Sequence, residues 1–389
     1  MKIRILVLYP YGQGYYPQHE VFGLLNGSDI TFVSPSREFE KTARTSGMQF
    51  LVARYVSLPA HFSVGVVEHA AISDLDQLID SVDPDVVVTY ELGSAVSYQI
   101  SRRRPKGRFR QIVLCDATSS AAKSASNWFP TTALFAAVTK RTLDMAIAHT
   151  QASSRAIRSA GVHHDRIRTI PPGIFIPDSR PWSPRSPSTP FHVVYLGALR
   201  ENKGVRQLIR AVKELGRAGI SLRLTVAGGG PLLNYLRSNE FGGLVRCVGR
   251  ISEDEKNTLL SQADLFVYPS IDVRAGPFYR WQEQTAISAI EAMQRGIPTI
   301  GSDSGALPEI LGRTDAIVQQ GSIASLARVM RRAILDADWR IALSRDQFEH
   351  ARSDYNIYDS ARTMEKILSE VVTRNVGPPD RGRPHHDLH

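Results

Sequence analysis

The chain has 389 residues, enough for two or three domains of ordinary size, and its 42% hydrophobic content is sufficient for filled cores. No apolar run approaches the roughly 20 residues that a membrane span needs, and the two cysteines, Cys115 and Cys247, form neither a disulfide framework nor a CxxC metal motif. The net charge of +9 alone suggests a nucleic-acid-binding protein, but no such motif accompanies it, so we expect no nucleic-acid partner.

The first half alternates short apolar runs with helical patterns, which predicts a parallel sheet covered by helices. The opening stretch MKIRILVLYPYG has no cleavable-leader pattern and predicts a buried first strand in a cytoplasmic protein. The expected strands are Ile3–Leu8, Asp29–Val33, Asp85–Thr89, Gln111–Cys115 and Met145–Ala148. The expected helices are Leu75–Ser81, Ser94–Arg103, Thr132–Thr142 and Gln151–Ala160.

A basic cluster, SRRRPKGRFRQ, runs from Ser101 to Gln111 between an expected helix and an expected strand. Such a cluster is suited to an anionic membrane surface, which would make the protein peripheral at the inner face of a membrane. A solvated loop explains the same composition, and the sequence alone leaves both interpretations open.

Seven prolines fall between Pro171 and Pro190, a density that neither a helix nor a central strand tolerates. After this linker the strand–helix alternation restarts. We therefore expect an N-terminal domain at 1–171, a linker at 172–190 and a second α/β domain at 191–355. A last helix near 356–375 is expected to pack back on the first domain, and 376–389 to be disordered. Ligands of such sheets bind at the carboxyl ends of the strands, so the site is expected in a cleft between the domains.

Two glutamates, Glu283 and Glu291, stand eight positions apart in RWQEQTAISAIEAM. On one helix this spacing separates them by about 80°, so they do not form a close acid/base pair. We place Glu283 just before a helix and Glu291 inside it, with the N–H groups of Thr285, Ala286 and Ile287 offered to an anion. Taken alone, the pair is better explained without a ligand, with Glu283 as a first-turn carboxylate favoured by the helix dipole and Glu291 as a solvated one.

Further loops of the second half follow expected strands in a fixed order. GALRENKG runs from Gly197 to Gly204, with Arg200 and Lys203 as cations for a diphosphate. VAGGGP, ADLFVYPS and GIPTIGSDSGALPEI come later in the chain, and each joins a strand to small or polar residues. No single motif is specific for one protein family, whereas their order and spacing together are specific.

With these motifs the sequence resembles a retaining glycosyltransferase of the GT-B fold, in the GT4 family (glycosyl transferases group 1). The resemblance spans the chain and is most specific from Val193 to Ile310. It implies an α/β architecture of two Rossmann-like domains facing each other across a cleft. It further implies that Glu291 binds the nucleotide ribose and that Glu283 contacts the transferred sugar. Lys203, in the donor-binding loop that begins at Gly197, is implied to hold the diphosphate.

The sequence also departs from the family pattern. Many members carry Arg where this chain has Ala198, and Arg200 is the candidate substitute. The usual E-G-F-G-L reads EQTAI, so both glycines are lost and Ala286 is expected to narrow the donor-sugar pocket. An unusually long segment precedes Glu283, in which Arg274, Tyr279 and Trp281 line the cleft or pack at its rim; packing is slightly favoured.

The first half matches the family less well. In the loop Tyr9–Glu20, Gly12 and Gly14 are expected to let the backbone approach a phosphate, and His19 is a candidate acceptor contact. Asp116 follows an expected strand where the family often has His nearby. It is the leading candidate for contacting the acceptor or the donor sugar, the alternative being a helix or loop cap.

The expected reaction is sugar transfer from a nucleotide diphosphate sugar to a hydroxyl of an envelope glycan, glycolipid or natural product. No DxD-type metal site is evident, since Asp74–Asp76 falls on a predicted surface helix, so neither a metal nor another cofactor is expected. A nucleotide-sugar 2-epimerase of the same architecture is the alternative enzyme. The motif set favours transfer.

Overall fold

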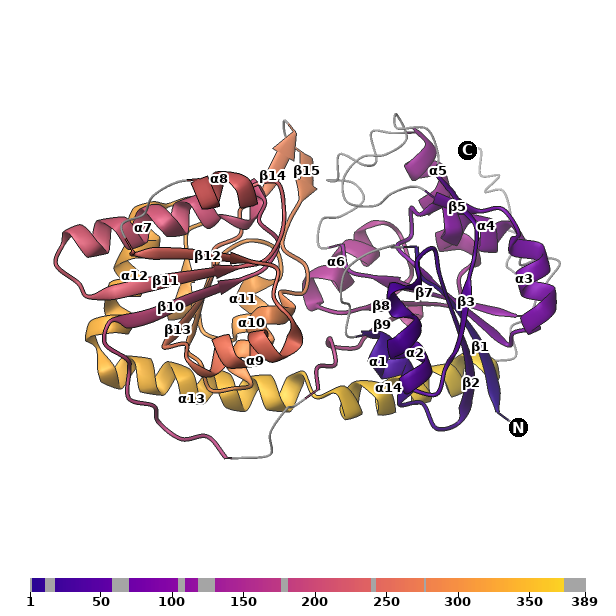
Figure 1. Cartoon of the computed structure of the whole chain (residues 1–389). Coiled ribbons are helices and arrows are strands. Elements are labelled where there is room, and N and C mark those ends of the chain that lie inside the picture. Colours follow the sequence, from indigo (N-terminus) through magenta and orange to yellow (C-terminus); the bar gives the residue numbers. More distant parts are fainter. Residues whose placement is uncertain are drawn as a thin grey trace, which may run out of the picture.

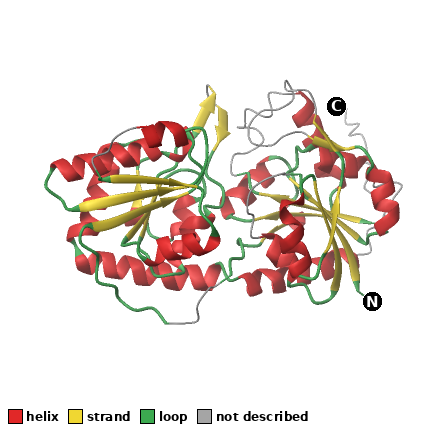
Figure 2. Ribbon diagram, viewed as in Figure 1, coloured by secondary structure: helices red, strands yellow, loops and turns green. Residues whose placement is uncertain are grey.

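The computed structural model describes residues 2–10, 18–57, 70–103, 109–117, 130–175, 181–238, 243–275 and 278–373. It contains two α/β domains lying side by side, each built on a parallel sheet with helices on both faces (Figures 1 and 2). The predicted fold class is therefore confirmed.

The first domain is centred on a seven-stranded sheet of order β3-β2-β1-β6-β7-β8-β9, in which every pair is parallel. Its strands are β1 (Ile3–Leu8), β2 (Ser28–Ser34), β3 (Gln49–Val52), β6 (Val86–Tyr90), β7 (Arg110–Cys115), β8 (Met145–Ala148) and β9 (Ile167–Thr169). Its helices are α1 (Gln18–Gly23), α2 (Glu40–Thr45), α3 (Leu75–Val82), α4 (Ala95–Arg103), α5 (Pro130–Thr142) and α6 (Gln151–Ser159). A short antiparallel pair, β4 (Tyr55–Ser57) and β5 (Ala70–Ile72), lies beside the sheet. The central strands are mostly apolar because both of their faces are buried.

The second domain has a six-stranded parallel sheet of order β12-β11-β10-β13-β16-β17. Its strands are β10 (Phe191–Leu196), β11 (Leu222–Ala227), β12 (Val245–Gly249), β13 (Leu265–Tyr268), β16 (Thr299–Ser302) and β17 (Ile317–Val318). Its helices are α7 (Val205–Arg217), α8 (Leu233–Ser238), α9 (Glu253–Ser261), α10 (Ile287–Met293), α11 (Leu307–Leu311), α12 (Ile323–Leu335) and α13 (Ala337–Asp354). Single 3₁₀ turns occur at 37–39, 164–166, 201–203 and 314–316.

The chain crosses between the domains at two adjoining segments. Ile174 donates its N–H to the carbonyl of Tyr355 at 2.9 Å and lies in the core of the second domain. Just beyond the return crossing, α14 (Ile357–Thr373) runs beneath the first domain (Figure 1) and places Met364, Leu368 and further apolar residues in its core. The two crossings thus join at one hinge, and the last helix belongs spatially to the first half of the chain.

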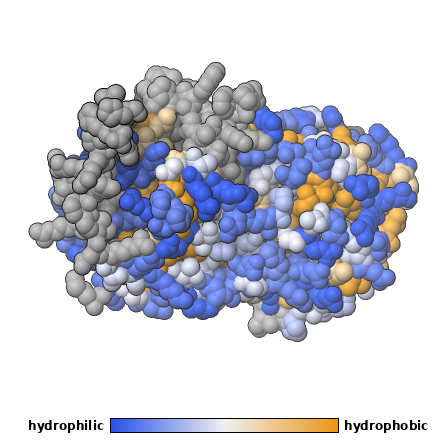
Figure 3. All heavy atoms as spheres, turned by 180° about the vertical axis from the view of Figure 1, so that it is seen from behind, coloured by the Kyte–Doolittle hydropathy of each residue, from blue (hydrophilic) through white to orange (hydrophobic). Residues whose placement is uncertain are grey.

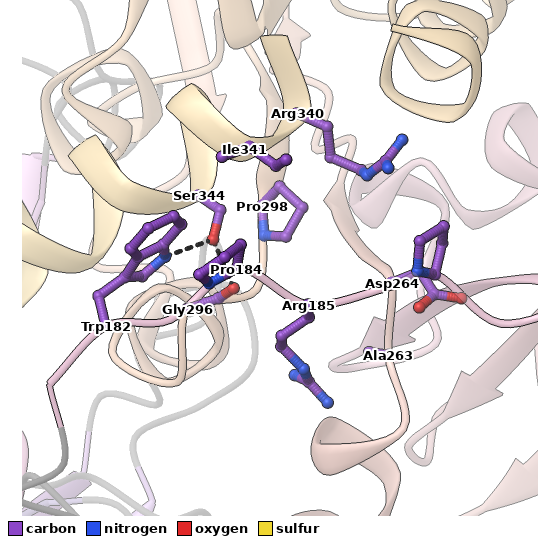
Figure 4. Close-up of a pocket in the computed structure, with 11 residues that line it drawn as sticks. Trp182, Pro184, Arg185, Ala263, Asp264, Gly296, Pro298, Arg340, Ile341 and Ser344 are labelled. Atoms are coloured by element: carbon purple, nitrogen blue, oxygen red, sulfur yellow. Dashed lines mark hydrogen bonds between the residues drawn. The ribbon is translucent and has the colours of Figure 1, made fainter. Parts of the chain in front are cut away.

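The proline-rich linker is attached to the second domain over its described part, 181–190. Trp182 donates its indole N–H to Ser344 Oγ at 2.9 Å (Figure 4), and Ser188 donates its backbone N–H to Asp264 at 3.1 Å. Arg185 donates to the Ser261 carbonyl. The small space between linker and domain is closed by α13 residues Arg340 and Ile341. The Asp264 side chain of the second domain thus satisfies a backbone N–H of this extended segment.

Several elements differ from the sequence prediction. The loop expected at Tyr9–Glu20 contains the start of α1, and the segment before Glu283 contains an antiparallel hairpin, β14 (Val273–Ala275) and β15 (Phe278–Trp281). The hairpin projects from the upper edge of the second domain, on the side next to the first domain (Figure 1). The expected tail at 376–389 lies outside the described residues.

No helix in the described ranges is both long enough and apolar enough to cross a membrane. The face seen from behind is largely hydrophilic, with apolar patches smaller than either domain (Figure 3). Of the basic cluster Ser101–Gln111, residues 104–108 lie outside the described part of the chain.

Candidate active site

The two domains meet where the carboxyl ends of their strands lie. Glu309 of α11, which follows β16, accepts hydrogen bonds from the N–H groups of Gln151 (2.6 Å) and Ala152 (3.2 Å) at the start of α6, which follows β8. The carboxyl-terminal edges of both sheets therefore border one interdomain cleft, the position that open α/β sheets use for ligands.

A buried ion pair forms the centre of the second domain's side of the cleft. Lys203 Nζ lies 2.7 Å from Glu283 Oε2, and the same carboxylate accepts a hydrogen bond from Ser270 Oγ. Glu283 is only 4% exposed, and Nζ also lies 4.5 Å from the centre of the Trp281 ring. The structure thus brings together a cation and a carboxylate that are separated by eighty positions in the chain.

Close backbone packing sets this geometry. The 3₁₀ turn that carries Lys203 ends at Gly204, whose φ is +68° and where a Cβ would lie 1.9 Å from the carbonyl oxygen of Pro269. The loop after β16 turns at Gly305, with φ +53°, where a Cβ would lie 2.0 Å from the carbonyl oxygen of Glu283. Only glycine fits such contacts. The loops after β10, β13 and β16 consequently converge on the Lys203–Glu283 pair.

Hydrogen bonds among polar side chains fix the segment that carries Glu283. Asp272 accepts hydrogen bonds from Ser304 Oγ (2.6 Å) and from the Gln282 side chain (2.9 Å). Ser304 Oγ in turn accepts from the N–H of Glu283 at 3.2 Å. The hairpin inserted before Glu283 is therefore tied at its base, and its Trp281 faces Lys203. Whether Arg274, Tyr279 and Trp281 line the cleft or pack at its rim stays a prediction, and the Tyr279 side chain lies outside what the structure describes.

The helix after Glu283 begins later than the sequence suggested. α10 starts at Ile287 with Ala286 as its N-cap, so Thr285 precedes the helix, and the offer of these N–H groups to an anion stays a prediction. The reason for the late start is the left-handed backbone of Ala286, whose φ is +37°. Ala286, Ala289, Ile290 and Met293 form the apolar side of this segment, since all four residues lie in one core cluster.

Glu291 is the fifth residue of α10 and points to α9. Its Oε1 lies 2.6 Å from Lys256 Nζ, and both side chains are about 10% exposed. Burial by itself lowers the pKa of Lys256, but the charges of Glu291 and Glu253 outweigh it, so the net pKa is raised. Glu291 and Lys256 border an interdomain groove of about 950 Å³ that α1 and α2 of the first domain also line.

The remaining residues predicted for the donor side lie near the pair or outside the described chain. Gly197 begins the loop after β10, and Arg200 directly precedes the turn that carries Lys203. The Arg200 side chain is exposed, and in the described part of the chain no residue forms a hydrogen bond or ion pair with it. Gly12 and Gly14 lie outside the described residues. His19 lies in α1, and nothing is described of its side chain.

Asp116 and an unpredicted residue, His149, lie at the strand ends on the first domain's side. Asp116 follows β7 and His149 follows β8, with Asp116 Oδ1 3.9 Å from His149 Nε2. Burial raises the pKa of Asp116 to about 7 and lowers that of His149 to about 4. Glu91 fixes the turn by accepting the N–H groups of Asp116 (2.9 Å) and Ala117 (3.2 Å).

The side chains of the described chain that are close enough together to hold a metal ion lie away from the Lys203–Glu283 pair in the sequence. The described chain has one such group, the exposed turn His163, His164 and Asp165. Of the Asp74–Asp76 stretch, Asp76 lies in α3 and pairs with Arg103.

Sequence reasoning missed four residues around the pairs, namely Lys256, Asp272, Ser304 and His149. Each is brought in by tertiary packing from a different element. The sequence offered only weak signals for them. Lys256 is a lysine near the start of a helix, Asp272 and Ser304 are polar residues shortly after buried strands, and His149 directly follows a buried strand. All of these patterns are common in residues with a purely structural role.

Comparison with known proteins agrees with this architecture. Residues 178–352 match the family model for glycosyl transferases group 1. A glycogen synthase of Mycobacterium tuberculosis is 32% identical over 163 residues, 40% of this chain and 37% of that protein. An amylovoran biosynthesis glycosyltransferase of Erwinia amylovora is 26% identical over 189 residues, 47% of this chain and 46% of the relative. The chain thus spans less than half the length of either curated relative.

Solved structures share the fold of both domains. The crystal structure of Anabaena HepE in complex with UDP superposes with a TM-score of 0.74 at 15% identity, covering 95% of this chain and all of that one. The sucrose-phosphate synthase of Thermosynechococcus elongatus gives a TM-score of 0.70 at 15% identity, covering 95% and 99%. The match to the glycosyl transferases group 1 model thus lies in the second domain and the segments flanking it, and the two domains together have the GT-B architecture.

Proposed function

We propose that the protein transfers a sugar from a nucleotide diphosphate sugar to an acceptor hydroxyl, with retention of the anomeric configuration. The 2.7 Å contact between Lys203 and Glu283 carries the proposal. A glycosyl transition state has positive charge on the sugar and negative charge on the departing diphosphate. A carboxylate beside a cation, held where three loops converge, is arranged to stabilise both charges.

The proposed roles follow the positions of the side chains. Glu283 contacts the transferred sugar, Lys203 and the exposed Arg200 bind the diphosphate, and Glu291 binds the ribose from the adjoining groove. Related folds support a nucleotide donor, since Anabaena HepE has been crystallised with UDP and with UDP-glucose. Lys203 supplies the positive charge that a divalent metal supplies in other transferases, so we propose that no metal is needed.

A donor screen tests this function. Purified protein is incubated with UDP-, GDP-, ADP- and dTDP-sugars, with and without EDTA and with and without a hydroxyl acceptor, and release of the nucleoside diphosphate is measured. We expect slow hydrolysis of one donor class, unaffected by EDTA, and an acceptor product whose anomeric configuration, read by NMR, matches the donor. Epimerised donor without acceptor, or inverted product, contradicts the proposal; activity lost on chelation and restored by Mg²⁺ contradicts its metal-free part.

The acceptor side of the proposal covers a hydroxyl on an envelope glycan, a glycolipid or a natural product. A lipid-borne acceptor would be reached at a membrane face, and the basic cluster Ser101–Gln111 has the charge to bind an anionic one. Co-sedimentation with anionic vesicles at low salt, absent with neutral vesicles, is the expected result. Equal pelleting with both kinds of vesicle contradicts this contact.

A further inference from the structure

Two buried polar atoms face each other across the first domain's side of the cleft. Asp116 Oδ1 and His149 Nε2 are both shielded from solvent, and neither has a hydrogen-bond partner in the described structure. The 3.9 Å between them is too long for a direct hydrogen bond but short enough for one oxygen atom to contact both. Buried polar atoms are rarely left unsatisfied, so such a gap indicates a site for a small polar group.

The surroundings fix the direction of the hydrogen bonds. His149 Nδ1 lies 2.8 Å from the carbonyl oxygen of Ile170, which only accepts, so Nδ1 carries the hydrogen and Nε2 of the neutral ring is an acceptor. The backbone of Asp116 is held by Glu91 and Ser153, which leaves its carboxyl group free to serve a ligand. The two side chains follow adjacent strands, β7 and β8, at the sheet edge that borders the cleft.

We propose that Asp116 and His149 together bind one hydroxyl group of a sugar, which donates its hydrogen to His149 Nε2 and accepts one from the protonated Asp116 carboxyl. This inference rests on the proposed function, because a sugar in the cleft is its ligand. The same chemistry fits a hydroxyl of the donor sugar or of a sugar acceptor. The nucleotide itself is proposed to bind across the cleft, at Lys203 and Glu291, so the pair acts on the sugar portion alone.

Protonation of Asp116 gives the site a pH signature. Burial raises the pKa of Asp116 to about 7 and lowers that of His149 to about 4, so between these values both groups are neutral and complementary to a hydroxyl. Above pH 7 the carboxylate is a second acceptor, which one hydroxyl cannot satisfy. Glu91, whose pKa is also raised by burial, and Tyr9 at the end of β1 are the other titratable groups facing Asp116 in the described chain.

Binding to protein with ¹⁵N-labelled histidines tests the site without relying on turnover. The His149 Nε2 resonance, assigned by its loss in His149→Gln, is followed while UDP, UDP-glucose or free glucose is added at pH 6 and pH 8. Calorimetry gives the UDP-glucose/UDP affinity ratio for the wild type, Asp116→Asn and His149→Gln. His192→Gln is the matched control, since His192 is an equally buried histidine whose two ring nitrogens already contact Gln262 and Thr225.

A donor-sugar contact predicts that UDP-glucose, but not UDP, shifts His149 Nε2 at pH 6 and less at pH 8. Asp116→Asn and His149→Gln then lower the affinity ratio about 3- to 10-fold, the effect of one lost hydrogen bond. An acceptor contact instead predicts a shift with free glucose and an unchanged ratio. No shift with either sugar overturns the inference and leaves a bound water only. A protein that binds none of UDP, GDP, ADP and dTDP refutes the proposed donor, whereas the free-glucose titration still tests this pair.

Discussion

Lys203 and Glu283 contact each other directly, so each balances the charge of the other inside a mostly buried site. Truncating one partner of such a pair typically costs about 3–5 kcal/mol of stability, because the other charge is left buried and uncompensated. Alanine variants therefore mix folding with chemistry. Substitutions that keep shape and hydrogen bonding are better probes at the scale of single residues.

The variant Glu283→Gln retains size and hydrogen bonding while removing the charge. We expect turnover to fall about 10²- to 10³-fold, the usual effect of removing one positioned electrostatic contact, with UDP or GDP affinity unchanged. Steady-state kinetics and calorimetry measure the two quantities. Glu201→Gln is the control, because Glu201 pairs with Arg206 on the exposed side of the same turn. Wild-type turnover in Glu283→Gln would remove Glu283 from the chemistry.

Glu291→Ala tests the ribose contact. Loss of a charged hydrogen bond should weaken nucleotide binding by about 1–3 kcal/mol, measured by calorimetry on the folded variant. The matched control is Glu253→Ala, which removes the exposed partner of the same lysine, Lys256. If both variants bind nucleotide as the wild type does, Glu291 serves only its ion pair with Lys256.

Asp116→Asn should be relatively more stable as pH rises. The folded-state pKa of Asp116, about 7, lies above its ordinary value of 3.8, so its stabilising contribution is full below pH 3.8 and lost as pH rises through 7. Asparagine has no such loss. Between pH 5 and pH 8 the variant should gain about 1–3 kcal/mol on the wild type in urea unfolding.

His149→Gln provides the opposite slope as a check. The lowered pKa of His149 means that the wild type loses stability as pH falls from 6.5 toward 4, so this variant should gain relative stability in acid. A pH-independent difference between wild type and Asp116→Asn would show that the carboxyl group is not shielded from water as the structure describes.

At the scale of elements, the backbone conformation of Ala286 determines where the short helix α10 begins. Ala286, at the position of a family glycine, keeps a left-handed backbone with φ +37° although it has a side chain. A left-handed conformation costs a non-glycine residue about 1–2 kcal/mol. The strain is tolerated here because Ala286 is buried against the sheet and its carbonyl accepts the first bonds of α10.

Ala286→Gly should therefore raise the free energy of unfolding by up to about 1 kcal/mol, since relief of strain exceeds the extra flexibility of the unfolded chain. Chemical denaturation measures the change. Ala289→Gly, three residues on and inside the helix, should lower stability by about 1 kcal/mol or more. Equal destabilisation by both substitutions would mean that Ala286 carries no backbone strain.

At the scale of the whole molecule, the cleft is bordered by a single hinge and a carboxylate contact. Ile174 and Tyr355 join the two crossings, while Glu309 of the second domain holds the start of α6 in the first. Carboxylates at helix N-termini contribute about 0.3–2 kcal/mol. A contact of that size is large enough to bias the spacing of two domains yet small enough to be broken during a catalytic cycle.

Glu309→Ala should shift the domains toward a wider cleft, changing the ratio of open to closed forms on the order of 5-fold for a contact of about 1 kcal/mol. Small-angle scattering should report a larger radius of gyration. The matched control is Glu365→Ala, because Glu365 accepts the N–H of Asn26 within one structural unit, α14 on the first domain. Identical scattering from Glu309→Ala and the wild type would show that Glu309 does not set the spacing.

The sequence by itself determined the strand–helix alternation, and with it the fold class. β1 has the predicted boundaries and α3 begins at the predicted residue, Leu75. A continuous apolar run signals a strand buried on two faces, and a 3.6-residue period signals a helix buried on one. The motif order also placed Lys203, Glu283 and Glu291 on the loops and helix of one sheet edge. Chain order is enough for that, since the carboxyl ends of parallel strands share an edge.

Only the tertiary structure decided which side chains meet. Lys203 contacts Glu283, Lys256 contacts Glu291, and Asp116 faces His149 because separate elements are packed together, and no local pattern encodes those distances. The start of α10 was likewise misplaced, since the left-handed turn at Ala286 is imposed by the loops packed around it against the preference of alanine. Local periodicity reports how a segment is buried, whereas the partners of a polar group depend on close packing between distant parts of the chain.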